Sequence, residues 1–313
     1  EINPDSGLYA EKVREFITKD DPEPFFLYFC TWDPHHPFKR EGSDTINPAD
    51  VIVPAHMSDT PENRDELAKY YMSMQRADKG LERLMEILKE SGQWDNTIVL
   101  FTSDNGRPFT GAKPNFWDPG IRLPFVFRDP NLENKGSSTD VMINFADITP
   151  TLLDYAGADL NKYDFHGRSF RSQLSKQKSI GFDTVYASHT FHEIQQPYHM
   201  RMVRDRKYKL IWNLTYQLTF PELGDKAGEM ADEIQQGTLT HFGKRTVRNF
   251  FQRPQYEFYD LDQDPDEINN LAYEPEYVEL RDQYLQKIYQ LQENTNDPWA
   301  KYRGYDKLQR VFE

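Results

Sequence analysis

An acidic side chain, an amide and a glycine come directly after an apolar, β-branched stretch. Residues 97–102 predict a buried strand, and Ser103-Asp104-Asn105-Gly106 stands where it ends. Sheets of α/β proteins bind ligands at the carboxyl ends of their strands. The oxygens of Asp104 and Asn105 could bind a hard divalent cation, and Gly106 permits a tight turn. An ordinary surface turn has the same composition, so both interpretations stay open at this point.

Two histidines follow a second apolar stretch. Residues 25–31 are expected to form a buried strand, and Asp33-Pro34-His35-His36-Pro37 comes after it. Prolines on both sides restrict the backbone and would hold an imidazole in one orientation. His35 or His36 could then hydrogen-bond an anionic oxygen or protonate a leaving group. For an isolated pair, exposed loop histidines without a role are the simpler interpretation.

Two further segments carry charged or polar groups that could contact a substrate. Lys113 lies in a glycine-containing loop, residues 111–115, where its ammonium group could neutralise a sulfate or phosphate oxygen. His192 and Glu193 follow an expected strand at 185–188 and could contact substrate hydroxyl or amine groups. A solvated lysine and a surface histidine–glutamate pair are the competing interpretations.

Alternating helices and strands must position these groups. The expected elements of the first half are a helix at 8–18, a strand at 25–31, a helix at 62–90, strands at 97–102 and 123–127, and a helix at 149–156. This order favours an α/β fold with a mixed, mostly parallel sheet flanked by helices. Later elements are strands at 185–188, 200–204, 208–213 and 256–261 and a helix at 275–292. They predict a smaller antiparallel α+β subdomain, and hence two parts, residues 1–180 and 181–313.

Composition excludes several classes of function. The 313 residues suffice for a large core. The net charge of -14 and the absence of a long basic run argue against nucleic-acid binding. Any anionic substrate therefore needs local cations. No apolar run approaches the roughly 18 residues of a membrane span. The single cysteine, Cys30, excludes an internal disulfide framework, and its apolar neighbours predict a buried core residue.

Several segments, taken in order, resemble the sequence blocks of formylglycine-dependent sulfatases. They are residues 25–35 for the histidine loop, 95–106 for the metal-binding strand, 120–124 for G-I-R-x-P, 147–153 for D-x-x-P-T-x-L, and 258–271 for L-Y-D-L…D-P-x-E-x-x-N-L. These blocks occur in family order and span nearly the whole chain. Within the family, His192-Glu193, residues 253–261 and Asp297-Pro298-Trp299 resemble the heparan N-sulfatases, also called sulfamidases.

The resemblance implies an alkaline-phosphatase-like fold and hydrolysis of sulfate groups from sulfated glycans or glycosaminoglycans. The N-sulfate of terminal glucosamine in heparan is the expected substrate, and one Ca²⁺ ion is the expected metal. The roles that it implies are Ca²⁺ ligation for Asp104 and Asn105, catalysis for His35 and Lys113, and substrate binding for His36, His192 and Glu193.

Part of the family pattern is missing. The family's nucleophile is a formylglycine made from the cysteine of C-x-P-x-R, whereas Cys30 precedes Thr31-Trp32-Asp33. The acidic pair that completes the family's Ca²⁺ site is also absent. We therefore expect this chain to be the C-terminal portion of a longer enzyme, inactive alone. Its missing N-terminal portion would be the partner that supplies the nucleophile.

Other functions stay open at this point. One is an aryl or glycosaminoglycan O-sulfatase, and another is a phosphatase or phosphodiesterase of the alkaline phosphatase superfamily. Asn105 disfavours the phosphatase, because zinc prefers histidine. A third is a non-catalytic homologue that binds sulfated glycans. The family's usual locations favour the periplasm or secretion in a bacterium, or the lysosome in a eukaryote.

Overall fold

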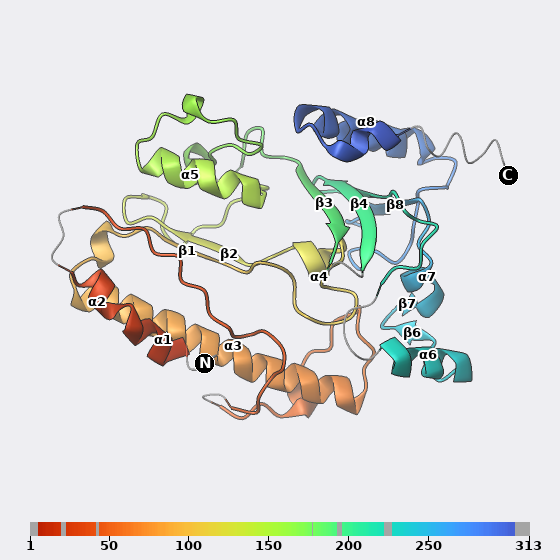
Figure 1. Cartoon of the computed structure of the whole chain (residues 1–313), viewed down its shortest axis with the longest axis horizontal. Coiled ribbons are helices and arrows are strands. Elements are labelled where there is room, and N and C mark those ends of the chain that lie inside the picture. Colours follow the sequence, from red (N-terminus) through yellow and green to blue (C-terminus); the bar gives the residue numbers. More distant parts are fainter. Residues whose placement is uncertain are drawn as a thin grey trace. The chain divides into compact units, whose positions relative to one another are not determined.

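The computed structural model describes residues 6–19, 23–41, 44–176, 178–192, 196–221 and 227–303. The chain forms two compact units (Figure 1). Unit 1 comprises residues 1–115, 119–131 and 234–246, and unit 2 comprises residues 116–118, 132–233 and 247–313. The chain thus passes from one unit to the other several times. The predicted boundary between two parts of the chain, at residues 180 and 181, stays a prediction.

Unit 1 is organised on a 30-residue helix, α3 (Pro61–Glu90), as the apolar spacing predicts. The Thr60 hydroxyl caps its start by accepting a hydrogen bond of 3.2 Å from the backbone N–H of Asn63. Gly92, with φ of +72°, follows its end in the left-handed conformation that glycine adopts most easily.

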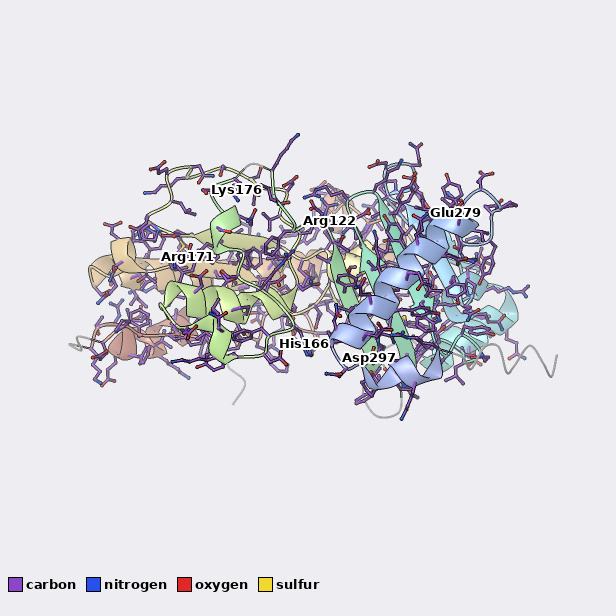
Figure 2. The ribbon with its side chains drawn as sticks, turned by 90° about the horizontal axis from the view of Figure 1, so that it is seen from above. Arg122, His166, Arg171, Lys176, Glu279 and Asp297 are labelled. Atoms are coloured by element: carbon purple, nitrogen blue, oxygen red, sulfur yellow. The ribbon has the colours of Figure 1, made fainter. Side chains whose placement is uncertain are left out.

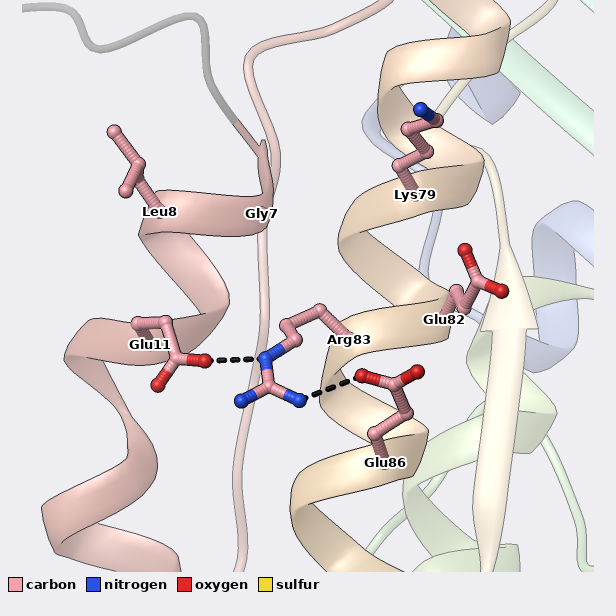
Figure 3. Close-up of a pocket in the computed structure, with 7 residues that line it drawn as sticks. All are labelled: Gly7, Leu8, Glu11, Lys79, Glu82, Arg83 and Glu86. Atoms are coloured by element: carbon pink, nitrogen blue, oxygen red, sulfur yellow. Dashed lines mark hydrogen bonds and ion pairs between the residues drawn. The ribbon is translucent and has the colours of Figure 1, made fainter. Parts of the chain in front are cut away.

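Two short helices, α1 (Ser6–Lys12) and α2 (Arg14–Ile17), pack beside α3 (Figure 1). An open depression between α1 and α3 is lined mainly by charged side chains (Figure 3). Arg83 binds Glu11 and, at 2.6 Å, Glu86 there. Hydrogen bonds from Arg14 and Arg83 lower the pKa of Glu11 to about 2. Three acidic and two basic side chains line the depression, so its charge does not favour an anionic substrate.

Residues 25–31 do not form the predicted strand. The segment is extended but belongs to no sheet, and its side chains alternate between partly buried and exposed. Cys30 is exposed, so the prediction of a buried core thiol is wrong. A strand also needs a hydrogen-bonded neighbour, and no described strand pairs with this segment.

The strand pairs of unit 1 are short. β1 (Val99–Thr102) pairs antiparallel with β2 (Phe125–Arg128), with Val99 opposite Arg128. The α/β class is confirmed, yet all strand pairs among the described residues are antiparallel, which corrects the expectation of a mostly parallel sheet. Residues 25–31, which were expected to be a strand of that sheet, pair with no described strand.

The predicted antiparallel subdomain is present in unit 2. β3 (Val185–Phe191), β4 (Pro197–Arg204), β5 (Tyr208–Asn213) and β8 (Tyr256–Asp260) form one antiparallel sheet in that order. Helix α8 (Val278–Asn294) packs on the sheet (Figure 2). Their shared core contains Val203, Leu210, Trp212, Phe258, Tyr284, Leu285 and Ile288.

The remaining elements are short. They are the helices α4 (Asp118–Ile121), α5 (Ile148–Tyr155), α6 (Ala227–Gln236) and α7 (Val247–Phe251), the strands β6 (His241–Phe242) and β7 (Arg245–Thr246), and the 3₁₀ helices Pro48–Asp50, Trp94–Asn96, Phe145–Asp147, Leu160–Lys162, Arg171–Gln173 and Pro298–Tyr302. No helix in the described part of the chain combines the length and the apolar character needed to cross a membrane.

A buried ion pair joins β4 to the segment after α8. Asp297, labelled in Figure 2, accepts hydrogen bonds of 2.6 and 2.8 Å from the Arg201 guanidinium. Burial alone would raise the pKa of Asp297, but Arg201 and the backbone N–H of Trp299 outweigh burial and lower that pKa to about 2.

We expect this pair to make the chain sensitive to acid. A carboxylate with a depressed pKa stabilises the fold above its unfolded pKa of about 3.9, and this stabilisation is lost as the pH falls towards about 2. The expected loss is about 1–2 kcal/mol after allowance for solvent screening. Urea unfolding between pH 7 and pH 2 measures it. Asp297→Asn should show a flatter pH dependence, and an unchanged slope would contradict this assignment.

Candidate functional site

The first group of predicted site residues lies on the loop after residues 25–31. His35 and His36 are both exposed, and Nδ1 of His35 lies 2.6 Å from the backbone oxygen of His36. A carbonyl oxygen only accepts hydrogen bonds, so Nδ1 of His35 carries the hydrogen. Nε2 of His35 is therefore the nitrogen left for substrate. The ring of Trp32 lies 4.8 Å from the His35 ring.

The loop is anchored to α3 through a contact that sequence reasoning missed. The buried carboxylate of Asp33 accepts hydrogen bonds from Arg76 Nε at 2.9 Å and from Arg76 Nη2 at 2.6 Å. Arg76 Nη2 also lies 2.9 Å from the hydroxyl of Ser73. No local sequence pattern indicates this contact, because its partners are 43 residues apart.

The predicted metal ligands lie just after β1. The carboxylate of Asp104 is exposed, and the Nδ2 of Asn105 donates to the backbone oxygen of Gly106 at 2.7 Å. This bond uses the nitrogen of the Asn105 amide and leaves its oxygen as a possible ligand. Ca²⁺ takes six to eight oxygens, and no group of three or more acidic, histidine or cysteine side chains suited to a metal occurs among the described residues. Asp104 and Asn105 therefore fit part of a Ca²⁺ shell.

Two glycines allow the loop that carries Lys113 to pack closely against neighbouring backbone. The backbone N–H of Gly106 donates to the oxygen of Gly120 at 3.1 Å. A Cβ on Gly120 would lie 2.2 Å from the oxygen of Asn115 and 2.4 Å from that of Ala112, inside van der Waals contact. The glycine of the G-I-R-L-P segment thus lies directly against the loop that carries Lys113.

We expect Gly120→Ala to displace this loop. Overpacking of close backbone contacts costs about 1–3 kcal/mol, and urea unfolding measures it. Gly136→Ala is the control, because Gly136 has a positive φ of +73° but no atom within 4 Å of an added Cβ. Its cost is limited to backbone strain. A Gly120→Ala variant as stable as the parent chain would contradict the close-packing argument.

An aromatic cluster brings the histidine loop and the lysine loop together. Phe38, which follows the histidines, lies 5.4 Å from the ring of Tyr70 on α3 and 5.6 Å from that of Phe109. Phe109 lies in the loop between Asn105 and Lys113. Burial raises the pKa of Tyr70, while the charge of Arg107 opposes the rise, which places Arg107 beside this cluster.

Lys113 is partly buried, and its backbone N–H donates to the oxygen of Arg107 at 3.3 Å. Within the described ranges no carboxylate forms an ion pair with its ammonium group. A partly buried cation without an acidic partner can bind an anionic oxygen of a ligand.

A second group of predicted residues lies in unit 2. His192 follows β3, and its backbone N–H donates to the oxygen of Gln196 at 3.2 Å. Glu193 lies outside the described residues, so its role stays a prediction. His189 on β3 hydrogen-bonds the oxygen of Tyr198 through Nδ1 at 2.6 Å, and Nδ1 therefore carries the hydrogen. Burial, and then the proximity of His192, lowers the pKa of His189.

More cationic groups lie near these histidines than the sequence indicated. Burial lowers the pKa of His199, and the charge of Arg201 adds to this effect. The buried Arg253 guanidinium lies 3.5 Å from the ring centre of Phe220 and 4.1 Å from that of Trp117. Its charge contributes to the low pKa of His189. The charges of Arg201 and Arg253 thus both act on His189, and that of Arg201 is paired with Asp297.

Two family models match the sequence. The sulfatase model matches residues 3–158, and the model for N-sulphoglucosamine sulphohydrolase, C-terminal, matches residues 112–238. The chain belongs to the sulfatase family. The resemblance seen in the ordered sequence blocks is therefore confirmed.

Relatives of this sulfatase chain are longer. Human N-sulphoglucosamine sulphohydrolase is 29% identical over 325 residues, which cover 92% of this chain and 64% of the human protein. A putative sulfatase, yidJ from Bacteroides fragilis, superposes with a TM-score of 0.69 at 22% identity, covering 95% of this chain and 60% of that one. A protein solved with its substrate D-glucosamine-2-N,6-O-disulfate has a TM-score of 0.57 at 21% identity, covering 77% and 44%. These similarities confirm the alkaline-phosphatase-like fold class.

Proposed function

We propose that this chain is part of a sulfatase that hydrolyses the N-sulfate of terminal glucosamine in heparan-type glycans. The observation that carries the proposal is the match to N-sulphoglucosamine sulphohydrolase along 92% of this chain, together with the matching C-terminal family model. The complex of a structural relative with glucosamine disulfate supports a sulfated amino sugar as the substrate class.

The residues of unit 1 would act on the sulfate group. Lys113, with no acidic partner among the described residues, would bind sulfate oxygens and stabilise the charge that develops on them. His35, fixed through Nδ1, would exchange a proton with the leaving nitrogen through Nε2. Asp104 and Asn105 would ligate the Ca²⁺ ion, which supplies further positive charge when bound.

The nucleophile would come from polypeptide outside these 313 residues. Cys30 is exposed and therefore accessible, but the residues after it do not form C-x-P-x-R. A formylglycine made from another cysteine would supply the attacking hydroxyl group. The chain alone would bind sulfated sugars weakly and would not turn them over.

The residues of unit 2 would recognise the sugar. His192 and Glu193 are proposed to contact its hydroxyl and amine groups, and His36 to contribute from the histidine loop. We place the enzyme in the bacterial periplasm or outside the cell, or in the lysosome if the source is eukaryotic.

A substrate comparison tests the proposal. The polypeptide encoded by the gene and the 313-residue chain are each assayed with glucosamine N-sulfate, glucosamine 6-O-sulfate and 4-nitrophenyl phosphate. We expect the longer polypeptide to release sulfate from the N-sulfate, the 313-residue chain to be inactive, and chelation of Ca²⁺ to abolish turnover. Preference for the 6-O-sulfate would indicate an O-sulfatase, and preference for the phosphate ester a phosphatase. Binding without hydrolysis would indicate a non-catalytic homologue.

A further inference from the structure

The extended segment 25–31 in unit 1 has two apolar faces. Phe25, Leu27 and Phe29 pack against the core formed by α1, α2 and α3. Phe26 and Tyr28 point the other way and are 71% and 79% exposed. This alternation is that of a β-strand. Its inner face is covered, and its outer face carries large aromatic rings in water.

The backbone of this segment is also unpaired. Between Pro24 and Thr31, no backbone N–H or C=O forms a backbone hydrogen bond with any other described residue. Strand backbones seldom stay unpaired, because an open row of donors and acceptors invites pairing with another strand. Natural edge strands are protected by charges, prolines or bulges. Residues 25–30 contain no charge, proline or glycine.

A strand that is apolar on both faces is typical of the interior of a sheet covered on both sides. Val99, the first residue of β1, packs against the same apolar core as Phe25 and Leu27. β1 pairs with β2 along one edge only. Two open strand edges therefore border one apolar core within unit 1.

We infer that residues 25–31 form an interaction surface for an extended apolar segment of the same polypeptide that lies outside residues 1–313. That segment pairs with the backbone of 25–31 as a β-strand, and the polypeptide around it covers Phe26 and Tyr28. The occupant is argued from length, since this chain spans only 64% of the human relative that it matches. The inference rests on the proposed function only in expecting further polypeptide, and it needs no catalytic activity.

The single thiol of the chain provides a direct test. Cys30 lies at the end of the segment and is exposed. We expect an uncharged thiol reagent to label Cys30 at least 100-fold more slowly in the polypeptide encoded by the gene than in the 313-residue chain, as read by peptide mapping. Amide exchange of residues 25–31 should slow by a similar factor, while that of α8 stays the same.

Three results would overturn the inference. One is equal labelling of Cys30 in both proteins, and another is a gene product that contains only these residues. The third is a 313-residue chain that dimerises with Cys30 protected, which would make a second copy the occupant. Protection of Cys30 without sulfatase activity would refute the proposed function and leave this inference standing.

A matched pair of variants separates docking from local folding. Phe26→Lys should leave the unfolding midpoint of the 313-residue chain unchanged, because the ring is 71% exposed, but should restore Cys30 labelling in the longer polypeptide. Tyr163→Lys, at a tyrosine that is 55% exposed in unit 2, should change neither. Loss of protection in both variants would contradict a specific surface.

Discussion

Replacing Lys209 with methionine is expected to lower the free energy of unfolding of unit 2 by about 3–5 kcal/mol. Lys209 is fully buried on β5, and its Nζ lies 2.6 Å from carboxylate oxygens of both Asp118 and Glu267. It also donates to the backbone oxygen of Phe116 at 3.0 Å. Methionine fills a similar volume but carries no charge. Two carboxylates would then lie in the interior without their shared cation.

The expected pH dependence of the variant follows from Glu267. Burial raises the pKa of Glu267, and the charge of Lys209 partly offsets that rise. Without Lys209 the pKa rises further, so the folded variant binds a proton at a pH where the unfolded chain does not. Its folded state then binds more protons than the unfolded state, and stability is recovered as the pH falls. Lys209→Met should therefore differ most from the parent chain near neutral pH.

Urea unfolding followed by tryptophan fluorescence measures the effect, because Trp117 and Trp212 both lie in unit 2. Lys207→Met is the matched control, since Lys207 is 49% exposed and lies 3.8 Å from Asp260. An exposed pair contributes at most about 1 kcal/mol. Adding Glu267→Gln to Lys209→Met should recover part of the loss. Equal stability of the two lysine variants would contradict the buried-network argument.

Lys209 also illustrates what the sequence could and could not indicate about the fold. The strand 208–213 and its hairpin partner are predicted because apolar periodicity and a short turn are local signals. A lysine within that strand looks like a solvent-facing position. Its burial depends on Glu267, far along the chain, and no local pattern encodes that contact.

The candidate site shows the same limit. The placement of Asp104 and Asn105 after a strand, and of His35 on a proline-rich loop, followed from local sequence. The anchor between Asp33 and Arg76 joins residues 43 apart, and only the fold reveals it. At residues 25–31 the continuous apolar run predicted a buried strand, but the structure has an extended segment with one partly buried and one exposed face. The predictions that this segment is paired in a sheet and buried were wrong. Both properties depend on a neighbouring strand, which the segment's own sequence does not specify.

Lys113→Ala in the longer polypeptide is expected to reduce kcat for glucosamine N-sulfate by about 10²–10³-fold. Its ammonium group would stabilise charge that develops on the sulfate oxygens, and this interaction strengthens in the transition state. The loss should therefore fall mainly on kcat, with a smaller rise in KM. Steady-state kinetics measures both. Lys79→Ala, which removes an exposed lysine of α3, should leave both constants unchanged.

The two adjacent histidines separate a chemical role from a binding role on the same loop. His35→Gln removes Nε2 as a proton carrier and is expected to reduce kcat by about 10²–10⁴-fold. His36→Gln keeps the backbone oxygen that fixes His35, so it should raise KM and leave kcat nearly intact. If both variants lost kcat equally, the effect would come from the loop's conformation and not from the His35 imidazole. If neither did, the proton at the leaving nitrogen would have to come from a residue outside this loop.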